Sequence, residues 1–144
     1  MAKKFNFKYN SILKLRAEKV NQAQELLFQA ERIKIEKQKI IAEYKNYING
    51  LLNNNTKNNK ISDFQNIAYH KQFINSEIEK LEKEKVQIDE IISLRRNKLN
   101  EAMKDEKVLE KLKEKKLNCY KEELNKEETK FLDEISMKKV NKIN

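Results

Sequence analysis

Apolar residues recur every seven positions along the first third of the chain. Two positions of this repeat, three residues apart, carry most of them. The first position holds Leu13, Val20, Leu27, Lys34, Ile41 and Ile48, and the second holds Arg16, Ala23, Ala30, Lys37, Tyr44 and Leu51. A third position widens the stripe on its flank with Ile12, Leu26, Ile33, Ile40 and Tyr47. This periodicity is typical of a coiled-coil helix and predicts one over about residues 10–52.

The stretch LNNNTKNNK, residues 52–60, interrupts this pattern. Asparagine favours turns, and the single glycine, Gly50, stands just before the stretch, where a helix would end. The following SDFQ matches a capping box, in which Ser62 caps the next helix and Gln65 reaches back to the cap. The sequence therefore predicts a loop over about residues 53–61 and a second helix over about residues 62–138.

The second helix has an apolar seam of its own. This seam consists of Ile67, Ile74, Leu81, Ile88, Arg95, Ala102 and Leu109, with Ile78, Ile92 and Leu99 beside it. The pattern then slips by about one residue and resumes through Leu117, Tyr120, Leu124, Phe131 and Ile135. Two seams joined by a short loop are expected to bury each other. We therefore expect an all-α fold of one domain, residues 1–144: a long antiparallel two-helix coiled-coil hairpin whose second helix overhangs the first.

The overhang follows from the unequal lengths of the two helices. Antiparallel pairing about the loop places the start of the first helix opposite about residue 104. Some 30–35 residues of the second helix then extend beyond the first, which is roughly 50 Å at 1.5 Å per residue.

Three aromatic residues stand at the base of this overhang. Phe5, Phe7 and Tyr9 alternate with polar residues, as in an extended segment. We expect them to fold across the second helix near Leu109 and Leu112. They would act there either as a hydrophobic clamp or as part of a docking end.

Composition and charge support long helices and suggest an acidic partner. The 144 residues include one glycine and no proline, and 38% are charged, whereas globular domains average about 7% glycine and 25% charged residues. The net charge is +9, and the first 20 residues hold six basic residues against one acidic residue. Such a cluster favours an acidic protein, nucleic acid or anionic lipid, although a solvated lysine-rich face is the plainer interpretation.

The sequence argues against an enzyme. One glycine cannot form a phosphate-binding loop, and one histidine with one cysteine cannot form a zinc site. His70 and Cys119 cannot form a catalytic dyad, because 49 helical residues separate them by roughly 70 Å. We therefore expect no catalytic residues, no metal and no cofactor.

The sequence also indicates a cytoplasmic protein. Cys119 is the single cysteine, which excludes a disulfide framework and fits a reducing compartment. No apolar run approaches the roughly 18 residues that span a bilayer. The basic start is not followed by the apolar stretch of a secretory signal. We expect no direct insertion into a bilayer.

Four segments resemble the FliJ family of flagellar type III export proteins. They are FNFKYNSILKLRAEK at the start, AEYKNYINGL before the loop, YHKQFINSEIEKLE after it and the tail EKKLNCYKEELNKEETKFLDEISMKK. The four occur in the family's order and cover nearly the whole chain. The resemblance implies a non-enzymatic coiled-coil stalk that couples the hexameric export ATPase to the export gate, and a general chaperone or escort for flagellar protein export.

The resemblance also implies partners, a location and two sets of contact residues. The partners are the hexameric export ATPase, the export-gate membrane protein (FlhA-like) and export chaperones or substrates. The location is the cytoplasm, peripherally at the inner face of the plasma membrane at the flagellar base. The ATPase-facing end would be Phe5, Phe7, Tyr9, Leu117, Tyr120, Leu124, Phe131 and Ile135. The gate-facing tip would be Ile41, Tyr44, Ile48 and Phe73.

A basic coiled-coil rod that binds nucleic acid, or a structural adaptor, is the alternative. Aromatic residues interleaved with lysines near the start could stack on bases, and such binding would depend steeply on salt. The middle of the chain is nearly charge-balanced and carries no nucleic-acid-binding motif. We therefore expect no nucleic-acid partner.

Overall fold

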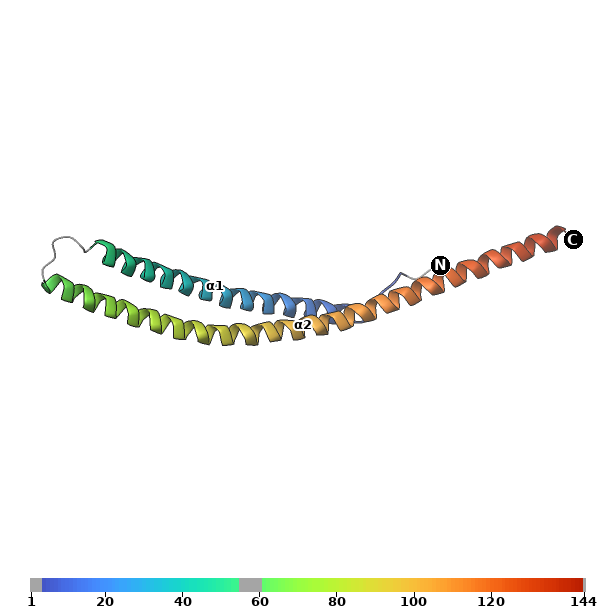
Figure 1. The fold of residues 1–144 in the computed structure, drawn as a ribbon. Helices are drawn as coiled ribbons and strands as arrows, with labels where there is room; N and C mark the ends of the chain where they lie inside the picture. The colour runs from blue at the N-terminus through green and yellow to red at the C-terminus, as the bar shows by residue number, and fades with distance from the viewer. Residues whose placement is uncertain (1–3, 55–60, 144) are drawn as a thin grey trace. The chain divides into compact units, whose positions relative to one another are not determined.

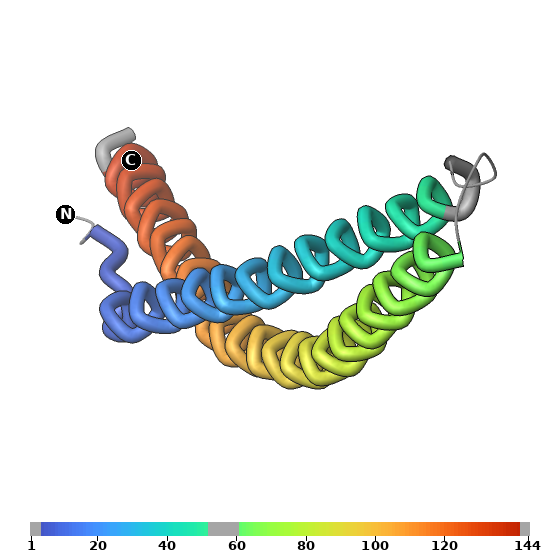
Figure 2. The backbone as a smooth tube through the Cα atoms, turned by 90° about the vertical axis from the view of Figure 1, so that its left-hand side faces the viewer, coloured from blue at the N-terminus to red at the C-terminus, as the bar shows by residue number. Residues whose placement is uncertain are grey.

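The computed structural model describes residues 4–54 and 61–143, and these form two long helices. Helix α1 spans Asn10–Asn54 and helix α2 spans Ile61–Ile143 (Figure 1). Figure 2 traces each helix as a continuous coil over the residues that it draws in colour. Most of the predicted loop falls on residues 55–60, which lie outside the described residues. Helix α2 starts one residue before Ser62, so Ser62 belongs to its first turn and is not its N-cap.

The contacts divide the chain into two units, which we describe separately. The inner unit is Asn21–Asn100, and the terminal unit combines Met1–Val20 with Glu101–Asn144. In the inner unit, α1 and α2 lie side by side and run in opposite directions (Figure 1). The described residues contain no strand. The expected all-α fold with two antiparallel packed helices is confirmed.

The core of the inner unit consists of two apolar clusters on the predicted seams. One cluster holds Ile41, Ile48, Ile74 and Ile78, with Tyr44 and Leu81 packed against it. The other holds Leu27, Ala30 and Ile92, with Ile88 and Leu99 packed against it. All of these residues occupy seam positions. They are buried because a seven-residue repeat keeps the same side of each helix turned toward its neighbour.

A charged layer separates these two clusters. Lys34 and Lys37, which interrupt the seam of α1, reach carboxylates on α2. The Lys34 Nζ lies 2.6 Å from Asp89 Oδ1, and the Lys37 Nζ lies 2.6 Å from Glu84 Oε2. The Lys37 hydrogen bond and charge hold the pKa of Glu84 below its ordinary value, with a smaller contribution from Lys80. Polar pairs at seam positions favour one register of the two helices over others.

In the terminal unit, the first turns of α1 pack against the middle of α2. Val20 and Leu109 are buried there. The Arg16 guanidinium donates a hydrogen bond to the Asp105 carbonyl oxygen at 2.7 Å, and the Lys113 ammonium donates one to Asn10 Oδ1 at 3.3 Å. Asn10 is the first residue of α1, so this bond connects the start of α1 to α2.

Candidate functional site

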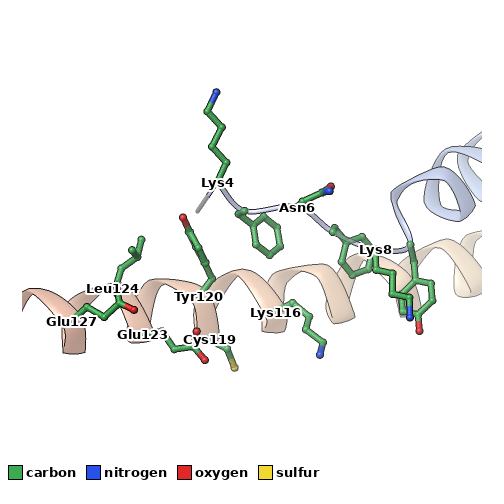
Figure 3. Close-up of a pocket in the computed structure, with 12 residues that line it drawn as sticks. Lys4, Asn6, Lys8, Lys116, Cys119, Tyr120, Glu123, Leu124 and Glu127 are labelled. Atoms are coloured by element: carbon green, nitrogen blue, oxygen red, sulfur yellow. The ribbon is translucent and has the colours of Figure 1, made fainter. Parts of the chain in front are cut away.

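The extended segment before α1 lies along α2. Residues 4–7 are non-helical, and a turn closes when the Asn10 amide donates to the Phe7 carbonyl oxygen at 3.2 Å. Phe7 is only 5% exposed, and its ring meets that of Tyr9 edge-on at 5.8 Å. Lys4 and Asn6 point away from α2 (Figure 3). Over residues 4–7 the alternation thus turns Phe5 and Phe7 toward α2 and Lys4 and Asn6 toward solvent, whereas Tyr9 lies in the turn and is 38% exposed.

Phe5 carries this packing further along α2. Its ring lies 5.6 Å from that of Tyr120, at an interplanar angle of 44°. This contact lies farther along α2 than Leu109 and Leu112, where we expected the aromatic residues to pack. The chain can reach Tyr120 because an extended segment rises more than twice as far per residue as a helix.

An open cavity of about 810 Å³ lies between the extended segment and α2 (Figure 3). From the segment it is lined by residues 4–9, and from α2 by Lys116, Cys119, Tyr120, Glu123, Leu124 and Glu127. Tyr120 and Leu124 rise from α2 toward the side on which the segment runs. The lining combines aromatic and aliphatic side chains with three lysines and two glutamates, so the cavity carries both signs of charge.

The structure separates the residues expected at the ATPase-facing end into two groups. Phe5, Phe7, Tyr9, Tyr120 and Leu124 come together around the cavity, and Leu117 lies half-buried between Leu109 and that cavity. Phe131 and Ile135 lie beyond it and are 63% and 36% exposed.

The last part of α2 is uncovered along its described length. Every described side chain from residue 125 to residue 141 is exposed, and we call this stretch the terminal segment. Besides Phe131 and Ile135, its exposed apolar residues are Leu132, Met137 and Val140. Sequence analysis missed these three, because they stand outside the seam register on which it relied.

The residues expected at the gate-facing tip differ in accessibility. Ile41 and Ile48 are 6% and 8% exposed and belong to the core, and Tyr44 packs against them. Phe73 is 61% exposed. Of the four, Phe73 is the one that presents most of its side chain to a partner.

Exposed apolar surface near the tip comes from the flank residues Ile40 and Tyr47, because Ile41 and Ile48 are buried. Ile40 and Tyr47 each stand one residue before a core isoleucine and are 38% and 49% exposed. Tyr47 also lies against His70: its hydroxyl oxygen is 3.0 Å from His70 Nε2, and the two rings meet edge-on at 5.4 Å. The flank stripe of the sequence already contained both residues, so their heptad position was the available signal.

The remaining chemical groups form no further cluster in the described part of the chain. Partial desolvation raises the pKa of Glu106, and the hydrogen bond and charge of Glu110 raise it further. Cys119 is a free, exposed thiol. Within residues 4–54 and 61–143 no three His, Cys, Asp or Glu side chains are grouped as a metal site would require. No described helix is apolar over a length that would cross a membrane.

Exposed apolar residues such as those of the terminal segment are a feature of proteins that bind other proteins. The family model described as flagellar FliJ protein matches residues 5–143. The chain therefore belongs to the FliJ family, whose members are non-enzymatic components of the flagellar export apparatus. Searches of curated proteins and of solved structures gave no significant match.

Proposed function

We propose that this chain is the coupling stalk between the hexameric flagellar export ATPase and the export gate. The observation that carries the proposal is the terminal segment, which exposes five apolar side chains on a helix with no covering element among the described residues. Exposed apolar groupings on a folded protein mark interaction sites. Membership of the FliJ family supports the export apparatus as the setting.

The ATPase-facing end divides into a base and a contact surface. Phe7 is buried and Phe5 packs on Tyr120, so these residues hold the base of the terminal segment. Phe131 and Ile135 lie on the exposed segment and make the contact with the ATPase. The six basic residues among the first 20 would favour an acidic lining on that partner.

The gate-facing surface is formed by Ile40, Tyr47 and Phe73. Burial supports this choice, because Ile41 and Ile48 are occupied in the core of the inner unit. The three proposed residues each expose more than a third of their side chain. The gate protein would therefore meet the flank of the helix pair and leave its seam closed.

The same exposed surfaces suit a chaperone or escort role. Amphipathic helices of export chaperones or substrates can lay their apolar face on exposed apolar positions of a helix. We place this work in the cytoplasm at the flagellar base, with association to the plasma membrane through the gate protein. No step of the proposal requires insertion into the bilayer.

The test is binding to the cognate export ATPase, with assembly and turnover of that ATPase as readouts. Phe131→Ser combined with Ile135→Ser should weaken binding about tenfold or more, which corresponds to about 1.4 kcal/mol, and should abolish stimulation of assembly. Lys130→Ser combined with Glu134→Ser is the matched control, because both residues are exposed on the same segment and the net charge is retained. If the wild-type chain leaves the ATPase unassembled and its turnover unchanged, the coupling role is wrong.

A further inference from the structure

An apolar stripe on one side of α2 continues from beneath the extended segment into the terminal segment. Leu117, Leu124 and Phe131 stand seven residues apart, so they lie on the same side of the helix. Tyr120 stands four residues before Leu124, and Ile135 four residues after Phe131, which places both beside that side. We call these five residues the terminal stripe. Its first three residues are half-buried, whereas Phe131 and Ile135 are 63% and 36% exposed.

The extended segment covers the part of the stripe that adjoins the exposed part. The ring of Phe5 lies 5.6 Å from that of Tyr120. Leu124 lines the cavity together with residues 4–9, on the side of α2 along which the segment runs (Figure 3). From residue 125 onward every described side chain is exposed. The cover of Tyr120 and Leu124 is therefore a segment of this same chain.

The two ends of the segment are held differently. Phe7 is 5% exposed, and its carbonyl oxygen accepts the Asn10 amide, so this end is fixed to the start of α1. Phe5 is half-buried and faces α2 across an open cavity of about 810 Å³. A closely packed interior leaves few voids larger than a water molecule. The Phe5 end is therefore loosely packed and can leave α2 while Phe7 stays in place.

The exposed part of the stripe is small for a stable interface. Phe131 and Val140 are separated by nine residues, or about 14 Å of helix. A specific protein interface usually buries about 800 Å² on each partner. Leu124 lies about 10 Å before Phe131 on the same side of the helix. A partner that extends its contact from Phe131 toward the base therefore meets Leu124 next, where the segment lies.

We propose that residues 4–6 are an autoinhibitory strap, which covers Tyr120 and Leu124 in the free chain and is displaced when the export ATPase packs along the whole terminal stripe. This inference rests on the proposed function and adds a regulatory step to it. Phe7 remains anchored and acts as the hinge. The strap lowers the apparent affinity for the ATPase, because only the fraction of chains with an open strap is competent to bind fully.

The first test is the affinity of the full chain for the cognate export ATPase. Phe5→Ser should bind about 2- to 10-fold more tightly than the wild type, the range that corresponds to the loss of one aromatic contact from the closed state. Leu124→Ser added to Phe5→Ser should reverse this gain, because the uncovered Leu124 then contacts the ATPase. Asn6→Ala is the matched control: Asn6 belongs to the strap but is exposed and points away from α2, so its substitution should leave the affinity unchanged. Circular dichroism establishes that each variant keeps its helices.

A second measurement follows the strap itself. Cys119 is the single cysteine of the chain, is exposed and lines the cavity, so it accepts a nitroxide label. Asn6→Cys supplies the second labelling position on the strap. Electron paramagnetic resonance should detect strong dipolar coupling between the two labels in the free chain. This coupling should be lost when the ATPase binds.

The outcomes separate the strap from the stalk. If the wild type binds the ATPase and Phe5→Ser binds equally well or more weakly, the strap is wrong while the proposed function stands. Dipolar coupling that persists in the complex leads to the same conclusion. If neither the wild type nor Phe5→Ser binds the ATPase, the proposed function and the strap are both wrong. Binding by Phe5→Ser alone would support the strap.

Discussion

The ring of Phe5 packs against the ring of Tyr120 at 5.6 Å, although the two residues belong to distant parts of the sequence. The contact joins the extended segment before α1 to a part of α2 that lies beyond the first residue of α1. It thus continues the apolar packing of α2 past the first residue of α1, Asn10. The extended segment takes the place of a helix at the base of the exposed terminal segment.

Phe7→Ala should detach the extended segment from α2. Phe7 is 5% exposed, and truncation of a buried phenylalanine costs about 3 kcal/mol or more when the cavity cannot close. Hydrogen exchange should then accelerate at the amides of Asn10 and Leu13, which the turn now protects. Asn6→Ala is the control, because Asn6 is exposed and points away from α2. Unchanged exchange in Phe7→Ala would show that the aromatic packing does not hold the segment.

Two neighbouring tip residues should separate stability from binding. Ile74→Ala should destabilise the protein by about 2–5 kcal/mol in urea unfolding, because Ile74 is buried in the core cluster. Phe73→Ala should change stability by no more than about 0.5 kcal/mol, because its side chain is 61% exposed. Phe73→Ala should nevertheless weaken binding to the export-gate protein. Normal gate binding by that variant would contradict the proposed gate-facing surface.

Acid should weaken the inner unit through Glu84. Lys37 holds the pKa of Glu84 below its ordinary value of 4.5. A carboxylate with a lowered pKa in the folded state stabilises the fold above its unfolded-state pKa, and this stabilisation is lost as the pH falls through the folded-state value. Lys37→Met removes the ion pair. The urea midpoint of the wild type should therefore fall more than that of the variant when the pH drops from neutral to below 4.5. Equal falls would show that the pair contributes nothing.

Glu106 should have the opposite dependence on pH. Partial desolvation and the neighbouring Glu110 raise its pKa above the ordinary value of 4.5. A carboxyl group with a raised folded-state pKa favours the fold below its unfolded-state pKa and loses that contribution as the pH rises through the folded-state value. Glu106→Gln should therefore raise the melting temperature at neutral pH and leave it nearly unchanged below pH 4.5. A lower melting temperature at neutral pH would contradict this explanation.

The sequence predicted the helices and their seams because both depend on local periodicity. Ile74, Ile92 and Leu109 stand at seam positions, and all are buried. The second helix was expected to end near residue 138, whereas α2 runs to Ile143, and no glycine or proline stands between these positions.

The candidate site was less predictable from the sequence. The heptad pattern placed Ile41 and Ile48 in the seam between the helices, whereas the resemblance to the family implied that they contact a partner. Both residues are buried, which agrees with the seam position. The path of residues 4–9 depends on which groove of α2 accepts the aromatic rings, and periodicity carries no information about that choice. For Phe5, the contact with Tyr120 lies farther along α2 than the expected position near Leu109 and Leu112.

The most direct test of the stalk proposal is site-specific photo-crosslinking in motile cells, with the crosslinking residue placed at position 131 or at position 73. Both side chains are more than 60% exposed, so the substitutions leave the fold intact. The proposal predicts that position 131 crosslinks to the export ATPase and that position 73 crosslinks to the export-gate protein. Crosslinking of both positions to one partner, or of neither position to these two proteins, would contradict a stalk that joins them.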